Sequence, residues 1–224
     1  MMSAPEIIPS LLVDSAEEFE RRLRLIENNC DTAQIDILDG SMFGATSWFD
    51  AEAIAAMKSS VKFELHLMVE NPLPVVEQFA LHVPNTIRAI IHAELDRPLG
   101  TLIEVIKQEH KMEAGVALNP ETPIDEIHHI MPHVDEVLVM GVHPGASGQG
   151  FGDEQHGISG EAIMAKITRI HERYPDLQIG IDGGVNEEQA PEMIQAGATR
   201  LSAASAIFND PDPVEALGKL QKIT

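Results

Sequence analysis

The sequence predicts an α/β fold, a single (β/α)8 barrel of the TIM type, with parallel strands, in which residues 1–224 form one domain. Two observations lead to this fold class. Short runs rich in Ile, Val and Leu alternate with amphipathic stretches of helical period, the pattern of βα units around a parallel sheet. The alternation repeats eight times in 224 residues, which fits a closed barrel better than an open sheet. An open, doubly wound sheet is the alternative, although no Gly-x-Gly-x-x-Gly opens the first helix.

The elements follow in strict alternation. In the first expected helix, Phe19, Leu23 and Ile26 recur at helical spacing on one face, and Asp14 and Ser15 are candidate caps. The longest connection, residues 145–159, is rich in Gly and polar side chains and is a candidate lid. The expected strands are residues 7–13, 33–38, 62–69, 87–93, 113–118, 136–142, 178–182 and 200–204, and the expected helices are residues 16–28, 51–58, 74–82, 99–110, 123–131, 160–174, 187–196 and 213–222.

The charge balance limits the partners of the protein. With 15 Lys plus Arg against 36 Asp plus Glu, the formal net charge of -21 repels nucleic acid and anionic membrane surfaces. A phosphorylated ligand would therefore need local dipoles such as backbone N–H groups. The sequence shows no basic amino-terminal leader or membrane-length apolar run, and its lone Cys30 fits a reducing compartment, so we expect a cytoplasmic protein. Assembly into a homo-oligomer is left open.

Polar residues gather at the expected carboxyl ends of the strands, where barrels of this type build their active sites. In order, they are Ser10, Gln34, Asp36, Asp39, Glu64, His66, His92, Glu94, Asn119, His143, Asp182, Ser202 and Ser205.

Two aspartates and a histidine in this set suggest acid/base chemistry. Alternation along the second strand turns Asp36 towards the barrel interior, while Asp182 ends the seventh strand, on the far side of the barrel. Two carboxylates facing each other across a ligand suit removal of a proton from carbon on one face and its return to the other. His66 could ligate a metal or hydrogen-bond the ligand. The structural alternatives are a solvated Asp36, an Asp182 that caps the Gly-Gly turn, and an ordinary core histidine.

Three segments are candidates for phosphate binding through backbone N–H groups. They contain Gly145, Ser147 and Gly148 after the sixth strand, Gly183 and Gly184 after the seventh, and Ala204 and Ser205 after the eighth. Glycines also simply make turns, so any one of these segments alone would be weak support.

A series of collinear motifs covers almost the whole chain. They are Ile8-Pro9-Ser10-Leu11-Leu12, Asp36-Ile-Leu-Asp39-Gly40, His66-Leu-Met68-Val-Glu-Asn71-Pro72, His92-Ala-Glu94, Leu118-Asn119-Pro120-Glu-Thr122-Pro123, Met140-Gly-Val-His-Pro144-Gly145, Asp182-Gly-Gly-Val185 and Ser205-Ala-Ile-Phe208. In these motifs the chain resembles the ribulose-phosphate 3-epimerase family. The His-Leu-Met-Val-Glu-Asn-Pro and Leu-Asn-Pro-x-Thr-Pro motifs are the specific ones.

The resemblance implies an isomerase of carbohydrate metabolism that inverts C3 of a ketose phosphate, D-ribulose 5-phosphate to D-xylulose 5-phosphate, through an enediolate. It assigns the acid/base roles to Asp36 and Asp182 and makes Asp36, His66 and Asp182 ligands of a divalent metal ion, which would be Zn, Mn, Fe, Co or Mg. It also places Ser10 and His66 against the substrate, and Met68 and Met140 beside the reacting carbon. The phosphate would lie on Gly145, Ser147, Gly148, Gly183, Gly184, Ala204 and Ser205.

The chain departs from the family pattern at the metal site. Gln34 stands where the family has its first metal-binding His, and a neutral oxygen ligand favours a harder ion than zinc. Ala204 replaces a phosphate-loop Gly, and the sixth loop is several residues longer. Two alternatives therefore stay open: a non-catalytic sugar-phosphate binder, and an epimerase of another ketose phosphate. A hexulose-phosphate synthase or decarboxylase is disfavoured, because Leu38 stands where the Asp-x-Lys-x-x-Asp pattern of those enzymes requires Lys.

Overall fold

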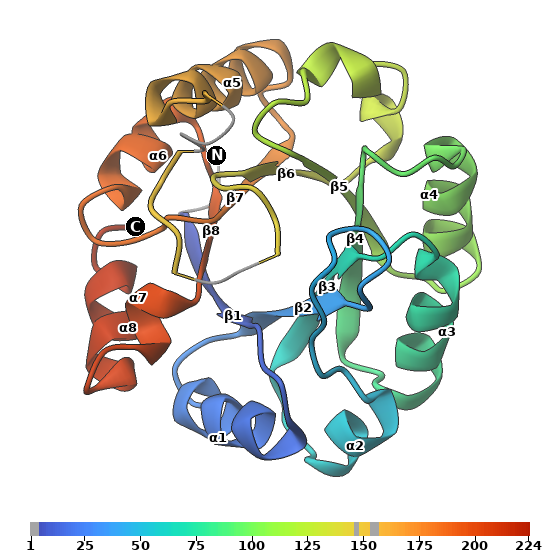
Figure 1. Ribbon diagram of the computed structural model, residues 1–224, viewed down its shortest axis with the longest axis vertical. Helices are drawn as coiled ribbons and strands as arrows, with labels where there is room; N and C mark the ends of the chain where they lie inside the picture. The colour runs from blue at the N-terminus through green and yellow to red at the C-terminus, as the bar shows by residue number, and fades with distance from the viewer. Residues whose placement is uncertain (1–4, 146–147, 153–156) are drawn as a thin grey trace.

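The computed structural model describes residues 5–145, 148–152 and 157–224, in which eight parallel strands close into a barrel. Each strand pairs with its neighbours in chain order, and the last strand pairs with the first. The barrel is seen end-on in Figure 1, with the ring of strands inside a ring of helices. The predicted fold class is therefore confirmed. The strands are β1 (Glu6–Leu11), β2 (Thr32–Leu38), β3 (Lys62–Met68), β4 (Thr86–His92), β5 (Glu113–Leu118), β6 (Glu136–Met140), β7 (Gln178–Asp182) and β8 (Arg200–Ala203).

The helices form the outer layer of the barrel. In the first of them, Phe19, Leu23 and Ile26 are buried as expected, and the predicted cap Ser15 accepts a hydrogen bond from the backbone N–H of Glu18 at 3.2 Å. None of the helices in the described ranges is long and apolar enough to span a membrane. Their bounds are α1 (Ala16–Ile26), α2 (Ala51–Ala56), α3 (Pro72–His82), α4 (Leu99–Gln108), α5 (Gly160–Arg173), α6 (Ala190–Ala196), α7 (Ser205–Phe208) and α8 (Pro213–Gln221).

The prediction of an α-helix over residues 123–131 is wrong. The structure has two short 3-10 helices there, η1 (Ile124–Ile127) and η2 (Met131–His133). The physical reason is the spacing of the apolar residues: Ile124, Ile127 and Ile130 recur every third residue and are all buried. A period of three matches the three residues per turn of a 3-10 helix, but over a segment this short it is also close to the α-helical period.

The main hydrophobic core lies between the sheet and the helices. In β2, the outward-facing Ile35 and Ile37 belong to this core, whereas Gln34 and Asp36 turn inward. Side chains on alternate positions of a strand face opposite sides of the sheet. The same alternation therefore builds the core and directs polar groups into the barrel.

The amino-terminal half of the barrel interior is filled by buried ion pairs. Arg88 Nη1 lies 2.9 Å from Glu64 Oε2 and 2.6 Å from Glu136 Oε2, and Arg200 pairs with the same two carboxylates. Burial and the charge of Glu64 raise the pKa of Glu136 to about 7, even though both arginines favour its ionised form. The expectation that Glu64 lies with the polar residues of the active site is wrong, because it belongs to this lower layer, two residues before His66.

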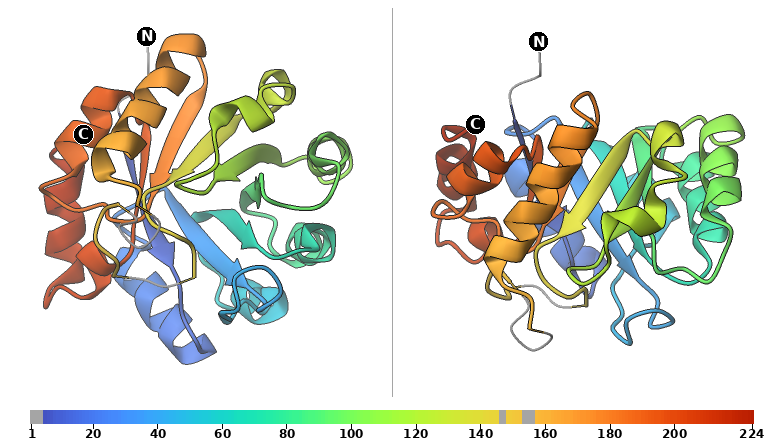
Figure 2. Two further views of the ribbon diagram at one scale, coloured as in Figure 1. Left: turned by 45° about the horizontal axis from the view of Figure 1, so that its top comes forward. Right: turned by 90° about the horizontal axis from the view of Figure 1, so that it is seen from above.

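Loops at the opposite end of the barrel surround its opening. Figure 2 shows that the β2–α2 connection, residues 39–50, and the described parts of the β6–α5 connection, residues 141–159, project from the same end. The strands end on this side of the barrel. Inward-facing side chains near the carboxyl ends of β2, β3 and β7 therefore point towards the opening between these loops.

Candidate active site

A pocket that opens to solvent lies at the carboxyl ends of the strands. The predicted site residues that line it are Asp36, His66, Met68, Met140, Gly145, Gly148, Asp182, Gly183, Gly184, Ser202, Ala204 and Ser205. Predicted Ser147 lies outside the described residues. Leu12, Val142 and Gln149 also line the pocket and were not predicted.

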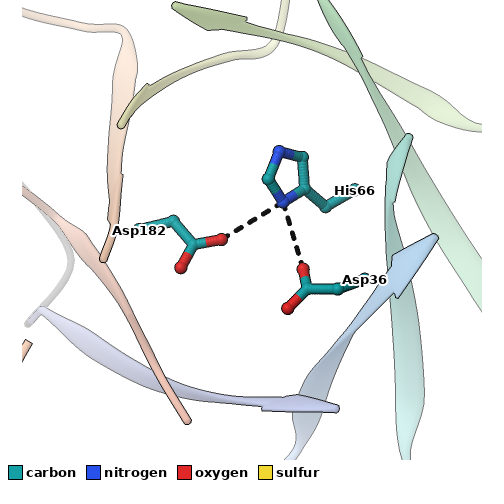
Figure 3. A group of neighbouring side chains, drawn as sticks. All are labelled: Asp36, His66 and Asp182. Atoms are coloured by element: carbon teal, nitrogen blue, oxygen red, sulfur yellow. Dashed lines mark hydrogen bonds and ion pairs between the residues drawn. The ribbon is translucent and has the colours of Figure 1, made fainter. Parts of the chain in front are cut away.

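Asp36, His66 and Asp182 form a compact cluster at the pocket floor (Figure 3). Asp36 and His66 are direct cross-strand partners in β2 and β3, and Asp182 reaches them from the end of β7. His66 Nδ1 lies 3.1 Å from Asp36 Oδ1 and 3.2 Å from Asp182 Oδ2. One ligand atom from each residue lies within 4.8 Å of the others, a separation that a single metal ion could bridge.

Gln34 joins this cluster from below and is fully buried. Its Nε2 donates to Asp36 Oδ1 and to Asp182 Oδ2, both at 2.6 Å, and lies 3.4 Å from His66 Nδ1. Its Oε1 accepts a hydrogen bond of 2.8 Å from Ser202 Oγ. The amide thus links the two carboxylates that the sequence placed on opposite sides of the barrel.

Ser10 is also fully buried and donates a hydrogen bond to Asp36 Oδ2. It is not one of the described residues that line the pocket. Its predicted contact with a substrate stays a prediction, whereas its contact with Asp36 is direct.

The environments of the two aspartates push their pKa values in opposite directions. Burial opposes ionisation of Asp36, but hydrogen bonds from His66, Ser10 and Gln34 and the His66 charge outweigh burial and lower its pKa. Burial and the neighbouring Asp36 charge raise the pKa of Asp182. Burial also opposes the charged form of His66, yet its hydrogen bonds to the two aspartates raise its pKa to about 9. The cluster therefore holds one carboxylate prone to ionise and one prone to carry a proton.

Behind the cluster lies a chain of hydrogen bonds to which the sequence analysis gave no role. His66 Nε2 lies 2.9 Å from His92 Nε2, and His92 Nδ1 lies 3.1 Å from Glu94 Oε2. Burial lowers the pKa of His92 to about 4, so this imidazole is neutral at physiological pH. The signal in the sequence was present, because His66, His92 and Glu94 follow one another at the ends of β3 and β4.

The described pocket lining contains no Lys or Arg. An anion there would depend on backbone N–H groups and on polar side chains such as that of Ser205, and the segment after β7 is built for close approach. Gly183 and Gly184 have φ values of +104° and +73°, and a Cβ on Gly184 would lie 2.6 Å from Phe151 Cα. Only glycine fits this position without moving the β6–α5 connection.

Three other polar residues predicted near strand ends lie outside the cluster. His143 Nε2 is 3.6 Å from Glu121 Oε1, and its ring lies edge-on to Phe43. Asp39 is exposed and accepts a hydrogen bond from the backbone N–H of Ser41. Asn119 is buried, and its N–H donates to Glu94 Oε1. In the described part of the chain, only Asp36, His66 and Asp182 form a group with metal-ligand geometry, and His143 does not belong to it.

Comparisons with a family model and with individual protein sequences point to the same family. The model of the Ribulose-phosphate 3 epimerase family matches residues 6–208. A ribulose-phosphate 3-epimerase of Bacillus subtilis is 32% identical over 219 residues, covering 96% of this chain and 98% of that protein. The cytoplasmic isoform of Oryza sativa is 32% identical, covering 98% of this chain and 92% of its own.

Solved structures with the same fold are more distant in sequence. A 3-hexulose-6-phosphate synthase from Salmonella typhimurium superposes with a TM-score of 0.72 at 12% identity, over 97% of both chains. KGPDC from Streptococcus mutans, solved with D-R5P, has a TM-score of 0.73 at 12% identity, covering 98% of this chain and 96% of its own. At such low identity these likenesses support the barrel fold and nothing finer.

Proposed function

The chain belongs to the ribulose-phosphate 3-epimerase family and is therefore an epimerase of carbohydrates, and on this premise we propose that it interconverts D-ribulose 5-phosphate and D-xylulose 5-phosphate. We further propose that residues 1–224 act as one domain. The main support for this proposal is that Asp36 and Asp182 reach one pocket from β2 and β7. Both carboxylates contact Gln34 and His66. A two-base inversion at carbon uses one such group on each face of the substrate.

In one direction, Asp36 acts as the base. Its lowered pKa keeps it ionised, and it removes the proton from C3, so the C3–H electron pair forms a C2–C3 double bond and the C2 carbonyl oxygen becomes an enediolate oxygen. Asp182, whose pKa is raised, gives its proton to C3 on the opposite face. The C2 carbonyl then re-forms with C3 inverted. In the reverse direction, the two aspartates exchange roles.

The phosphate end of the substrate would lie against backbone N–H groups of Gly183, Gly184 and the segment at Ala204 and Ser205. These residues share the pocket with the carboxylates. A Cβ on Gly148 would lie 3.9 Å from Ser205 Cβ, which brings the described part of the β6–α5 connection beside this segment. The net charge of -21 repels an anion at long range. Backbone N–H dipoles can still bind the phosphate, because they act at short range inside the pocket.

The donor set fits a divalent ion. Asp36 Oδ1, His66 Nδ1 and Asp182 Oδ2 converge within 4.8 Å, and Gln34 stands beside all three. Mostly oxygen donors favour a harder ion such as Mn²⁺ or Mg²⁺ over Zn²⁺. When bound, the ion would supply Lewis-acid stabilisation of the negative charge that develops on the C2 oxygen.

His92 and Glu94 would set the tautomer of His66. Ligation through His66 Nδ1 requires that nitrogen to be unprotonated, so its proton sits on Nε2 and is donated to His92 Nε2. His92 then carries its own proton on Nδ1 and donates it to Glu94. The chain from His66 to Glu94 thereby orients the ligand.

A second candidate is a sugar-phosphate binder without catalysis. It is favoured by Gln34 alone, whose Nε2 hydrogen-bonds both carboxylates at 2.6 Å and so satisfies them without an ion. Another ketose phosphate as substrate is a third candidate, because the β6–α5 connection shapes the pocket mouth.

Conversion of D-ribulose 5-phosphate, measured by circular dichroism or NMR with Mn²⁺ present, tests the proposal. We expect turnover in the wild type and a fall of about 10²- to 10⁴-fold in kcat for Asp36→Asn and for Asp182→Asn. Asp39→Asn is the matched control, because Asp39 is exposed and is not among the described residues that line the pocket. Tight binding of the phosphate ester without turnover in the wild type would favour the binder instead.

A further inference from the structure

The side-chain amide of Gln34 has a partner on each of its two ends. On one end, Nε2 donates to Asp36 Oδ1 and to Asp182 Oδ2, both at 2.6 Å, and lies 3.4 Å from His66 Nδ1. On the other end, Oε1 accepts the 2.8 Å hydrogen bond from Ser202 Oγ. The amide thus occupies the fourth corner of the group formed by the three proposed metal ligands.

Ser202 is placed for this contact by the barrel. It is the cross-strand partner of Asp182 in β8, and only 3% of its surface is exposed. A hydroxyl is both a donor and an acceptor, and its hydrogen can rotate to suit either partner. Ser202 can therefore donate to the amide oxygen or, if the amide is turned end for end, accept from the amide nitrogen.

We propose that Ser202 is a positioning residue that lets Gln34 present either end of its amide to Asp36, His66 and Asp182, and that this pair determines which divalent ion the pocket accepts. The inference rests on the metal site of the proposed function. With the nitrogen inward, the amide donates to the two carboxylates. With the oxygen inward, Gln34 is a fourth ligand, and its Nε2 donates to Ser202.

The chemistry of the amide sets the direction of the selectivity. Amide nitrogen is not a metal ligand while it carries both protons, so ligation needs the turned amide and a partner for its buried NH2 group. Amide oxygen is a hard, neutral donor, which suits Mn²⁺ and Mg²⁺ better than Zn²⁺. An apolar residue at position 202 would leave that NH2 group without its partner, whereas Thr would keep the hydroxyl.

The test is a titration of the purified protein with Mn²⁺ and with Zn²⁺ by calorimetry, in wild type, Ser202→Ala, Ser202→Thr, Gln34→His and the Ser202→Ala/Gln34→His double variant. Thermal unfolding by circular dichroism confirms that each variant is folded. We expect Ser202→Ala to weaken Mn²⁺ binding about 10- to 100-fold, as does the loss of other groups that orient a metal ligand. Ser202→Thr should bind Mn²⁺ as tightly as the wild type, because it keeps the hydroxyl. In the Gln34→His background, Ser202→Ala should have no effect, and Zn²⁺ should become the preferred ion.

The results that would contradict the role of Ser202 can be distinguished from those that would contradict the metal site. Mn²⁺ binding of equal strength in wild type and Ser202→Ala, or an equal loss in the Gln34→His background, overturns the role of Ser202 and leaves the proposed metal site standing. No binding of Mn²⁺ or Zn²⁺ by the wild type overturns the metal site and this inference together. Because the readout is metal affinity, neither result depends on turnover of a sugar phosphate.

Discussion

The buried ion pairs in the lower half of the barrel give a stability prediction that depends on pH. Two arginines, Arg88 and Arg200, face two glutamates, Glu64 and Glu136, and both carboxylates are 1% exposed. The change Arg200→Met leaves both glutamates with Arg88 alone. One buried negative charge then loses its partner.

The expected loss follows from this charge count. Breaking a buried ion pair by removing one partner typically costs about 3 to 5 kcal/mol of unfolding free energy. The pKa of Glu136 is already about 7, above its ordinary value of 4.5, so the folded state binds this proton more tightly than the unfolded state does. That stabilisation is complete below about pH 4.5 and is lost as the pH rises through 7. We therefore expect Arg200→Met to cost about 4 kcal/mol at pH 8 and about 3 kcal/mol at pH 5.5, since a single proton bound with a pKa of about 7 can change the cost by at most about 1.4 kcal/mol between these pH values.

Urea unfolding at the two pH values measures this difference. The matched control is the Arg200→Met/Glu136→Gln double variant, which removes one charge of each sign and should recover at least about 1 kcal/mol at pH 8. A loss for Arg200→Met that is the same at both pH values, or a double variant no more stable than the single one at pH 8, would refute the proposed charge balance.

Three further changes test other parts of the structure. Glu94→Gln should weaken Mn²⁺ binding about 10-fold, because a neutral partner holds the His92 tautomer less firmly; unchanged affinity in a competition with a chromophoric chelator would contradict this. Gly184→Ala should raise KM for the phosphate ester at least about 10-fold, since its Cβ would displace Phe151, and an unchanged KM would speak against the phosphate segment. Lys166→Met should cost about 2 kcal/mol of unfolding free energy, because the Lys166 ammonium donates to three backbone carbonyls at 2.7 to 2.8 Å, and an unaltered urea midpoint would rule that out.

Much of the fold could be predicted because the pattern of apolar residues and the geometry of the barrel agree. Parallel strands buried on both sides are recognisable as runs of Ile, Val and Leu, and each of the eight expected strands overlaps an observed one. The prediction of an α-helix over residues 123–131 was wrong because apolar residues at every third position of a short segment are compatible with either an α-helix or a 3-10 helix. The choice was made by contacts with the barrel, which bury Ile124, Ile127 and Ile130 together.

The site could be predicted in outline and not in depth. Strand ends converge in a parallel barrel, so Asp36, His66 and Asp182 were expected in one pocket. Depth along a strand is not visible in the sequence, because residues two apart point the same way but lie about 6.6 Å apart along the strand. That is why Glu64 was grouped with His66, although it belongs to the lower layer of ion pairs. The Ser202–Gln34 contact depends on the register of β8 against β7 and on the tilt of the strands, which residue spacing does not give.

The measurement that tests the two-carboxylate mechanism most directly is deuterium uptake at C3 from D₂O, followed by NMR with each epimer separately, in wild type, Asp36→Asn and Asp182→Asn. The mechanism predicts that each variant still exchanges the C3 proton of the one epimer whose C3–H faces the remaining carboxylate, while inversion is lost. The two variants should differ in which epimer exchanges. Loss of exchange from both epimers in one variant, with exchange and inversion intact in the other, would show that a single group does the chemistry and would contradict the assignment of Asp36 and Asp182 as a pair.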